Sequence, residues 1–273
     1  MKSEQSDIRV AIAGLGAIGL PVARWLDDGV PGLRLSAVAG SSPERAEAQT
    51  RDFRSRPAIV GLAQLAEHAD VVVEALPPER FAELAEPVVA AGRVLVVASL
   101  TQLLNHMSLV DRARASGGRI IAATGAIVGL DAVRAAAMGG PGRAVMRTSK
   151  PPQSLANALF VKEAGIDLAA LTEPVQLYAG NVRDAAVKFP ANVNVAVALA
   201  LAGWGPEKTE YQVWADPSLK RNTHHVLVET DAVRFEISIE NVPSDQNPAT
   251  GRITPLSVMA ALHRMVAPLV IGS

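Results

Sequence analysis

The segment of residues 8–19, IRVAIAGLGAIG, constrains the fold of this chain more than any other. A short apolar run rich in β-branched residues leads into Gly14, Gly16 and Gly19, spaced G-x-G-x-x-G, and a helical pattern follows. The first glycine permits a tight turn, the second lets a pyrophosphate approach the backbone, and the third lets the helix pack closely on the strand. A glycine-rich turn without a ligand is the alternative. We expect a dinucleotide whose phosphates lie at the helix N-terminus, in contact with Gly14, Gly16, Ala17, Ile18 and Gly19.

Four further apolar runs follow, at intervals typical of strands that alternate with helices. They are RLSAVAG (34–40), ADVVVEAL (69–76), GRVLVVAS (92–99) and GRIIAATG (118–125), and helical patterns separate them. Continuous apolar strands with helices between them indicate parallel pairing, with both faces of the sheet covered. The pattern predicts an α/β fold that begins with a Rossmann-type, doubly wound parallel sheet, which forms a dinucleotide-binding domain over residues 1–125.

The end of the second strand bears on the choice between NAD and NADP. A fold that prefers NAD usually carries Asp or Glu about 20 residues beyond the glycines, to hold the ribose 2′-hydroxyl. Here the strand ends in Gly40, Ser41 and Ser42, and Arg45 follows. We expect Ser41, Ser42 and Arg45 to contact the cofactor, with Arg45 paired to a 2′-phosphate, so that NADP is accepted and NAD stays open. A helix cap at Ser42 before Pro43, with Arg45 in solvent, is the other interpretation, and the two are compatible.

The second half of the chain has a different pattern. Its helical runs lie near 129–138, 154–165 and 181–203, the last interrupted at Pro190, and strands are expected at 142–152, 174–180, 209–216, 224–230 and 232–240. The last two strands alternate and are nearly continuous, which predicts a β-hairpin on a sheet with one buried face. We therefore expect a second α/β domain with a mixed sheet over 126–252, which binds substrate in a cleft beside the first. A closing helix in 253–273 should pack back on the first domain.

Two adjacent histidines, His224 and His225, stand where a loop becomes a strand. Side chains alternate along a strand, so the two rings should point to opposite faces, and at most one can serve a given site. A histidine at a strand edge is more often ordinary than catalytic, but the polar residues before this pair favour a site, since loops at strand ends commonly carry function. The remaining histidines, which we interpret as structural, are His68, His106 and His263.

The stretch FPANVN (189–194) places Asn192 and Asn194 at the start of an otherwise apolar helix. Asn192 can cap that helix, or one of the two amides can be buried and meet the nicotinamide carboxamide. Lys150 and Lys188 are candidates to hold a substrate carboxylate, with solvent exposure as the alternative for each.

The composition favours a soluble protein that binds small molecules. Hydrophobic residues make up 49% and charged residues 19% of the 273 residues, and the formal net charge is −1, so we expect no nucleic-acid partner. The N-terminus lacks the apolar stretch of a signal peptide, and the apolar run Val193–Trp204 is shorter than the ~20 residues that span a bilayer. We expect a cytoplasmic protein with no membrane partner. Cysteine is absent and adjacent histidines diverge on a strand, so we expect no metal site.

Several stretches together resemble the L-aspartate dehydrogenase family. They are GLGAIG, ATGAIVGLDAV (122–133), KFPANVNVAVALALAG (188–203), ADPSLKRNTHHV (215–226) and NVPSDQNPATG (241–251), and they cover nearly the whole chain. The resemblance implies a Rossmann domain joined to an α/β substrate domain in a homodimer. It also implies that His224 is the catalytic residue, and that Ala126 and either Asn192 or Asn194 contact the cofactor. The sequence departs from the family by carrying ATGAIVG where SGAIGG is more common, and by having His225.

The implied reaction is the NAD- or NADP-dependent oxidation of L-aspartate to iminoaspartate, then to oxaloacetate and ammonia, and its reverse. The ammonium of the substrate must lose a proton before hydride can leave the α-carbon, and a histidine with an ordinary pKa near 6.5 can accept that proton. The two substrate carboxylates call for cations or donors, for which we nominate Lys150, Lys188, Arg221 and Thr223. Because iminoaspartate is a precursor of pyridine nucleotides, the resemblance also links the chain to NAD biosynthesis.

Two other functions stay open at this point. One is a reductase of another small amino or imino dicarboxylate, similar to the dihydrodipicolinate reductases, although HHVLVET lacks the lysine and small-residue loop that follow the histidines there. The other is a dinucleotide-binding sensor without catalysis, in which His224 is structural.

Overall fold

The computed structural model describes residues 6–190, 193–244, 246–247 and 250–272. They form two compact units. One comprises the chain up to Ala123 together with Thr254–Val270, and the other comprises Thr124–Ile253 with the last residues of the chain.

The first unit is built on a six-stranded sheet with the order β3-β2-β1-β4-β5-β6, in which every neighbouring pair is parallel. The order reverses between β1 and β4, as in doubly wound dinucleotide-binding folds, so the predicted Rossmann-type sheet is confirmed. The sequence pattern does not predict β3, which is only 2 residues long. The strands are β1 (Ile8–Ala13), β2 (Leu33–Ala39), β3 (Ala58–Ile59), β4 (Val71–Glu74), β5 (Val94–Val97) and β6 (Arg119–Ala122).

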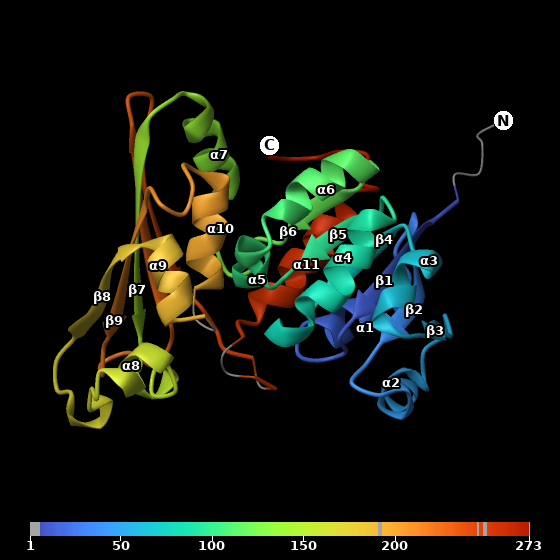
Figure 1. Ribbon diagram of the computed structural model, residues 1–273, viewed down its shortest axis with the longest axis horizontal. Coiled ribbons are helices and arrows are strands. Elements are labelled where there is room, and N and C mark those ends of the chain that lie inside the picture. Colours follow the sequence, from blue (N-terminus) through green and yellow to red (C-terminus); the bar gives the residue numbers. More distant parts are fainter. Residues whose placement is uncertain (1–5, 191–192, 245, 248–249, 273) are drawn as a thin grey trace. The chain divides into compact units, whose positions relative to one another are not determined.

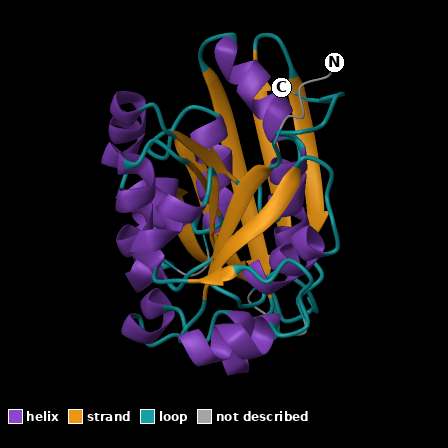
Figure 2. Cartoon of the chain, turned by 90° about the vertical axis from the view of Figure 1, so that its right-hand side faces the viewer, coloured by secondary structure: helices purple, strands orange, loops and turns teal. Residues whose placement is uncertain are grey.

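Helices pack beside these strands (Figure 1, Figure 2). The core includes Ile12 of β1, Val38 of β2 and Val73 of β4, and the C-terminal helix α11 adds Val258 and Leu262, all fully buried. The last helix therefore completes the core of the first unit. The helices are α1 (Gly19–Asp27), α2 (Pro43–Thr50), α3 (Leu65–His68), α4 (Phe81–Ala90), α5 (Leu100–Asn105), α6 (Ser108–Ser116) and α11 (Ile253–His263), with the short 3-10 helices Leu62–Gln64 and Pro78–Arg80.

The helix expected after the 92–99 strand is divided into α5 and α6 at His106. In a continuing α-helix the backbone N–H of His106 would donate to the carbonyl of Gln102. Instead Nδ1 of the His106 ring lies 2.8 Å from that carbonyl oxygen, and the N–H donates to Leu103. The ring also packs on Phe81, with 5.4 Å between the ring centroids. His106 thus has a structural role in this unit.

The second unit is built on a five-stranded sheet with the order β11-β10-β7-β9-β8. Strands β7 and β9 are parallel and the other neighbours are antiparallel, which confirms the predicted mixed sheet. The expected hairpin is present, because β10 pairs with β11 along its length. The strands are β7 (Gly142–Lys150), β8 (Val175–Asn181), β9 (Thr209–Ala215), β10 (Thr223–Thr230) and β11 (Arg234–Glu240).

Helices α9 and α10 contact this sheet, and α10 also packs on α7 (Figure 1). The helix expected at 154–165 is mostly wrong: a 3-10 turn follows Pro151, and only 5 residues near its end are α-helical. The N–H groups of Leu155 and Ala158 donate to acceptors three residues back, which is turn rather than α-helix bonding. The helices are α7 (Leu130–Met138), α8 (Leu159–Glu163), α9 (Val182–Lys188) and α10 (Asn194–Ala202), with the 3-10 helices Pro152–Ser154 and Leu168–Ala170.

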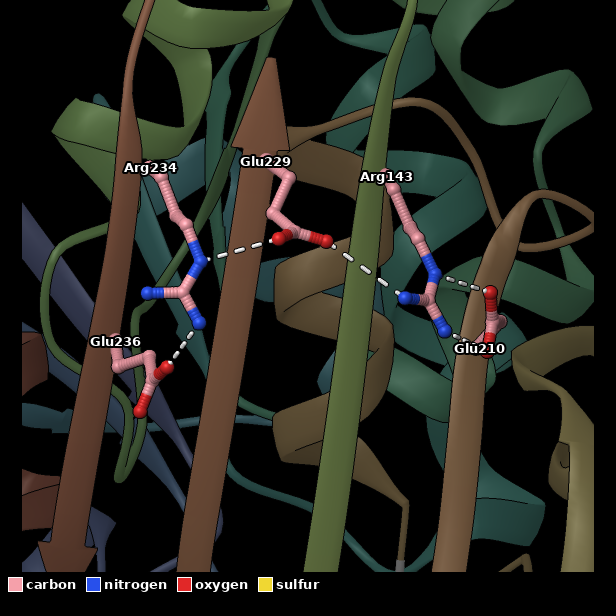
Figure 3. Close-up of polar contacts among 5 residues, drawn as sticks. All are labelled: Arg143, Glu210, Glu229, Arg234 and Glu236. Carbon is pink, nitrogen blue, oxygen red and sulfur yellow. Dashed lines mark hydrogen bonds and ion pairs between the residues drawn. The ribbon is translucent and has the colours of Figure 1, made fainter.

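The exposed face of the second sheet carries a row of ion pairs (Figure 3). Arg143 of β7 binds Glu210 of β9 with two hydrogen bonds, at 2.8 and 3.0 Å, and its other nitrogen lies 3.6 Å from Glu229 of β10. Arg234 of β11 bonds Glu229 at 3.1 Å and Glu236 at 2.6 Å. The charges alternate and are solvated, so each pair contributes little to stability.

Candidate active site

The turn between β1 and α1 has the geometry that a dinucleotide needs. Gly14 has φ +92°, and a Cβ there would collide with the backbone oxygen of Ala75. A Cβ on Gly19 would collide with the backbone oxygen of Gly14, so the third glycine lets the helix close on the turn. Gly16 differs, because no atom lies within 4 Å of the place where its Cβ would be. Two glycines are therefore needed for packing, and the middle one leaves open space beside the backbone.

The N-terminus of α1 is suited to an anion. No side chain caps it and its first turn has no acidic residue, so the positive end of the helix dipole is not offset there by a carboxylate. The amide of Gln49 donates to the carbonyl of Leu15 at 2.9 Å and holds the turn from the side of α2. These features fit a pyrophosphate at residues 14–19.

A buried carboxylate, Glu74, organises the loops beside this turn. Its oxygens accept hydrogen bonds from the backbone N–H groups of Leu76, Ala98 and Ser99 and from the Ser99 hydroxyl, at 2.8–3.2 Å. Burial raises the pKa of Glu74, and the four hydrogen bonds act in the opposite direction. Glu74 thus joins the loops after β4 and β5 and fixes Ala75, against which Gly14 packs. Sequence reasoning missed it; the signal was a carboxylate at the end of the apolar strand VVVE.

At the end of β2, Ser42 caps α2 by accepting a hydrogen bond from the backbone N–H of Arg45 at 3.3 Å, with Pro43 in the first turn. The alternative interpretation as a helix cap is thus confirmed. The side chain of Arg45 is exposed, as is Ser41. Glu44 lies beside them, and hydrogen bonds from its own backbone N–H and from Ser42 lower the pKa of its carboxyl group. A cation and a carboxylate therefore both lie just after β2, where dinucleotide-binding folds carry the residue that contacts the ribose.

His224 lies on the buried face of the second sheet. It is 3% exposed, and Val226 and Val228 are buried on the same side, whereas His225 is exposed on the other. The divergence of the two rings is confirmed. Nδ1 of His224 lies 2.9 Å from Oγ1 of Thr148, its cross-strand neighbour on β7. Thr148 is also hydrogen-bonded to the hydroxyl of the buried Tyr211 on β9.

Burial shifts two pKa values in this region downward. Desolvation lowers the pKa of the His224 ring to about 3, with smaller contributions from electrostatic interactions with Lys150 and His225. Burial also lowers the pKa of Lys150 to about 8. Lys150 is the last residue of β7, is 6% exposed, and shares a face with Thr148 two residues earlier. The structure thus brings together two of the nominated residues, His224 and Lys150, in a poorly solvated site. Groups of this kind are typical of functional sites.

The other nominated substrate ligands lie on α9, in the loop before β10 and on the other face of β10. Strand alternation puts Thr223 on the face of His225, where its hydroxyl points to the carbonyl of Ser149 at 3.5 Å. Lys188 is exposed at the end of α9, with its Nζ 5.1 Å from the ring centroid of Tyr178. Arg221 is exposed in the loop before β10. We therefore correct the nomination of Thr223, because the strand register directs it away from the buried face.

The nominated cofactor contacts of the second unit have mixed outcomes. Ala126 is buried in the loop after β6, between Gly125 and Gly129, both at positive φ. Asn194 is exposed at the first residue of α10, so the expectation of a buried amide is wrong for this residue. Asn192 lies outside the described residues.

Among the described residues, no group of three or more histidines, aspartates or glutamates is placed to hold a metal ion. In the same part of the chain, no helix has both the length and the apolar character needed to cross a membrane.

Comparison with known proteins identifies relatives over the whole chain. Residues 131–265 match the family described as "Aspartate dehydrogenase, C-terminal", and residues 14–123 match "Homoserine dehydrogenase, NAD binding domain". An L-aspartate dehydrogenase of Bradyrhizobium diazoefficiens is 48% identical over 272 residues, which cover 100% of this chain and 96% of that protein. One from Bordetella bronchiseptica is 47% identical over 277 residues, which cover 99% of this chain and 100% of that protein.

Among solved structures, the aspartate dehydrogenase of Thermotoga maritima matches with a TM-score of 0.74 and 22% identity. The match covers 97% of this chain and 99% of that one. At this identity the likeness shows the fold, namely an α/β chain of the same architecture.

The exposed position of Arg45 predicts a selective effect on NADP. We expect Arg45→Ala to weaken NADP binding roughly 10- to 100-fold, since a hydrogen bond to a charged group contributes about 1.5–3 kcal/mol, and to leave NAD binding unchanged. Fluorescence titration with both reduced cofactors measures this. Arg51→Ala, an equal charge change at the other end of α2, is the matched control. Equal effects of the two substitutions on NADP would show that Arg45 makes no specific contact.

The buried His224 predicts a pH-dependent stability. Its folded pKa lies below the unfolded value near 6.5, so the unfolded chain binds more protons and stability is lost as the pH falls through this window. Between pH 6.5 and about 4.5 we expect the free energy of unfolding of the wild type to fall by about 2–3 kcal/mol more than that of His224→Gln. Urea unfolding at several pH values measures both. Parallel pH curves would mean that His224 is not held neutral by burial.

Proposed function

We propose that this chain, which belongs to the L-aspartate dehydrogenase family, oxidises L-aspartate to iminoaspartate with NAD or NADP and releases oxaloacetate and ammonia. The same site serves the reverse reductive amination. The observation that carries the proposal is the buried pair of His224 and Lys150, which combines a neutral base with a cation in a site largely closed to water. The family resemblance of the sequence is confirmed.

The nicotinamide ring of the cofactor, when bound, accepts the hydride from the substrate α-carbon. His224 takes the proton from the substrate ammonium. This frees the lone pair of the nitrogen, which drives the loss of hydride from the α-carbon. His224 releases the ammonium proton to the solvent and, neutral again, accepts a proton from the water that attacks the imine carbon; it then returns that proton to the departing nitrogen. General acid–base help of this kind contributes roughly 10²–10⁴-fold to the rate.

The low pKa of His224 belongs to the free protein, and bound substrate changes it. Two carboxylates bring negative charge into a site that otherwise holds the positive charge of Lys150. Negative charge within a few ångströms favours the imidazolium and raises the pKa of the ring. His224 is thus a weak base in the absence of substrate and a stronger one beside it. Lys150 is our first choice for the cation that holds a substrate carboxylate, because it shares the buried face with His224.

The cofactor is held by the turn at residues 14–19, with the pyrophosphate at the start of α1. Open space beside Gly16 and the uncapped helix N-terminus support this assignment. Arg45 offers a cation for a 2′-phosphate and Glu44 offers an acceptor for a ribose hydroxyl, so both NAD and NADP belong to the proposal. The contacts of Ala126 and of either Asn192 or Asn194 with the cofactor stay predictions.

Three wider properties also stay predictions of the family resemblance and the composition. They are a homodimer, a cytoplasmic location, and a supply of iminoaspartate to NAD biosynthesis. Light scattering on the purified chain at several concentrations tests the dimer.

The proposed reaction is tested by the initial rate of reduced-cofactor formation at the nicotinamide absorbance band. We expect turnover with L-aspartate and none with D-aspartate, L-glutamate or L-malate. His224→Ala should lower kcat by about 100-fold or more with cofactor binding retained, because the 14–19 turn belongs to the other unit. His225→Ala, on the opposite face, is the matched control and should keep most of the activity. Turnover by His224→Ala close to wild type would contradict the assignment of the base.

The role of Lys150 predicts a pH-dependent affinity for dicarboxylates. Succinate has both carboxylates and no ammonium, so its inhibition constant reports the binding cation without the chemistry. Because the Lys150 pKa is about 8, we expect succinate to bind about tenfold more weakly for each pH unit above 8, and this dependence to vanish in Lys150→Met. Lys188→Met should keep it. If Lys188→Met removes the dependence instead, Lys188 is the ligand.

A further inference from the structure

We propose that Thr148 and Tyr211 are positioning residues, which hold His224 in the tautomer with its proton on Nδ1 and its lone pair on Nε2. The inference rests on the proposed function, in which His224 is the base. It deepens that function by naming which ring nitrogen takes the proton and which residues decide this.

The three side chains lie in a row across three neighbouring strands. His224 on β10 and Thr148 on β7 are directly opposite each other in the antiparallel pair, with 2.9 Å between Nδ1 and Oγ1. Tyr211 on β9, the other neighbour of β7, is hydrogen-bonded to Thr148. Thr148 is fully buried, Tyr211 is 1% exposed and His224 is 3% exposed. Water therefore does not compete for these bonds.

The direction of the bonds in this row decides the tautomer. The Thr148 hydroxyl has one proton, and it stands between the Tyr211 hydroxyl and the imidazole. Thr148 occupies Nδ1, so Nε2 is the ring nitrogen left to act as the base, and its lone pair must be free for that role. Nδ1 then donates to Thr148, and Thr148 donates its own proton to the phenolic oxygen of Tyr211. Nε2 is left unprotonated and is the atom that can accept a proton from the substrate.

A neutral hydroxyl at Nδ1 of the imidazole differs from a carboxylate in its effect on the stability of the charged imidazolium. A carboxylate fixes the tautomer and also stabilises the imidazolium, whereas a threonine hydroxyl only fixes the tautomer. The ring can therefore be oriented and still release its proton readily between the two proton transfers. If Thr148 were only structural, it would form a hydrogen bond with the buried Nδ1 but would not favour the tautomer with the proton on that nitrogen. The positioning role and the structural role therefore predict different values of kcat for Thr148 variants.

Four variants separate these interpretations. Thr148→Val keeps the shape and removes the hydroxyl, Thr148→Ser keeps the hydroxyl, and Tyr211→Phe removes only the phenolic oxygen. The matched control is Thr209→Val, because Thr209 is also fully buried and its hydroxyl donates to a backbone carbonyl at 2.9 Å. Thr209 pairs with Ala144, four residues from Thr148 along β7, or about 13 Å away. Thermal unfolding of all four variants shows how much stability each loses.

We expect Thr148→Val to lower kcat for L-aspartate roughly 10–100-fold, with the KM for aspartate and the affinity for reduced cofactor within about 3-fold of wild type. Thr148→Ser should restore kcat to within about 3-fold, and Tyr211→Phe should fall between the two. Thr209→Val should lose a similar amount of stability and keep kcat. Nitrogen-15 NMR of the His224 ring, assigned by its absence in His224→Gln, should show Nδ1–H alone in the wild type and a mixture of tautomers in Thr148→Val.

Two results from the ring spectra would each overturn the proposal, and so would one kinetic result. One is a wild-type ring with its proton on Nε2. The other is a Thr148→Val protein whose ring spectrum matches that of the wild type. Equal losses of kcat in Thr148→Val and Thr209→Val would show that Thr148 acts through stability alone. The ring spectra are recorded without substrate. A wild type that does not turn over L-aspartate would therefore refute the proposed function. The spectra would still show whether Thr148 and Tyr211 set the tautomer of His224.

Discussion

The burial of the His224 imidazole against Thr148 is the interaction on which the proposed chemistry of the second unit depends. A ring in water would titrate near pH 6.5, but this one is buried beside a cationic lysine and stays neutral in the free protein. The antiparallel register of β7 and β10 places Thr148 directly opposite, so the sheet itself sets the orientation of the base. A shift of one residue would move His224 to the exposed face and bring His225 inward.

A different constraint applies in the first unit, where backbone segments approach each other closely at the turn between β1 and α1. Gly14 and Gly19 are needed because a side chain at either would strike a neighbouring carbonyl oxygen, and Gly16 leaves the space that a pyrophosphate needs. Glu74 holds the neighbouring backbone in place by accepting hydrogen bonds from the loops after β4 and β5. A buried carboxylate is costly unless hydrogen bonds compensate it, and here four donors do so. The cofactor turn is therefore shaped by packing on one side and by a buried acceptor on the other.

Much of this architecture follows from local patterns. The spacing of the glycines after an apolar strand predicted the cofactor turn, and strand alternation separated His224 from His225. The contacts of His224 could not be predicted from the sequence, because they depend on the register between strands that are far apart along the chain. Thr148 lies 76 residues from His224 along the chain, and no local pattern links it to that ring or to Tyr211. Alternation alone could have corrected Thr223, which precedes His224 in the same strand and so faces the other way.

The central claim is that the chain removes hydride from the α-carbon of L-aspartate while His224 takes the ammonium proton. Turnover of L-aspartate deuterated at that carbon, followed by mass spectrometry of the reduced cofactor, tests it most directly. The account predicts that the deuterium is found in the nicotinamide ring, in an amount equal to the oxaloacetate formed. Deuterium found in the solvent, or retained on the four-carbon product, would contradict it.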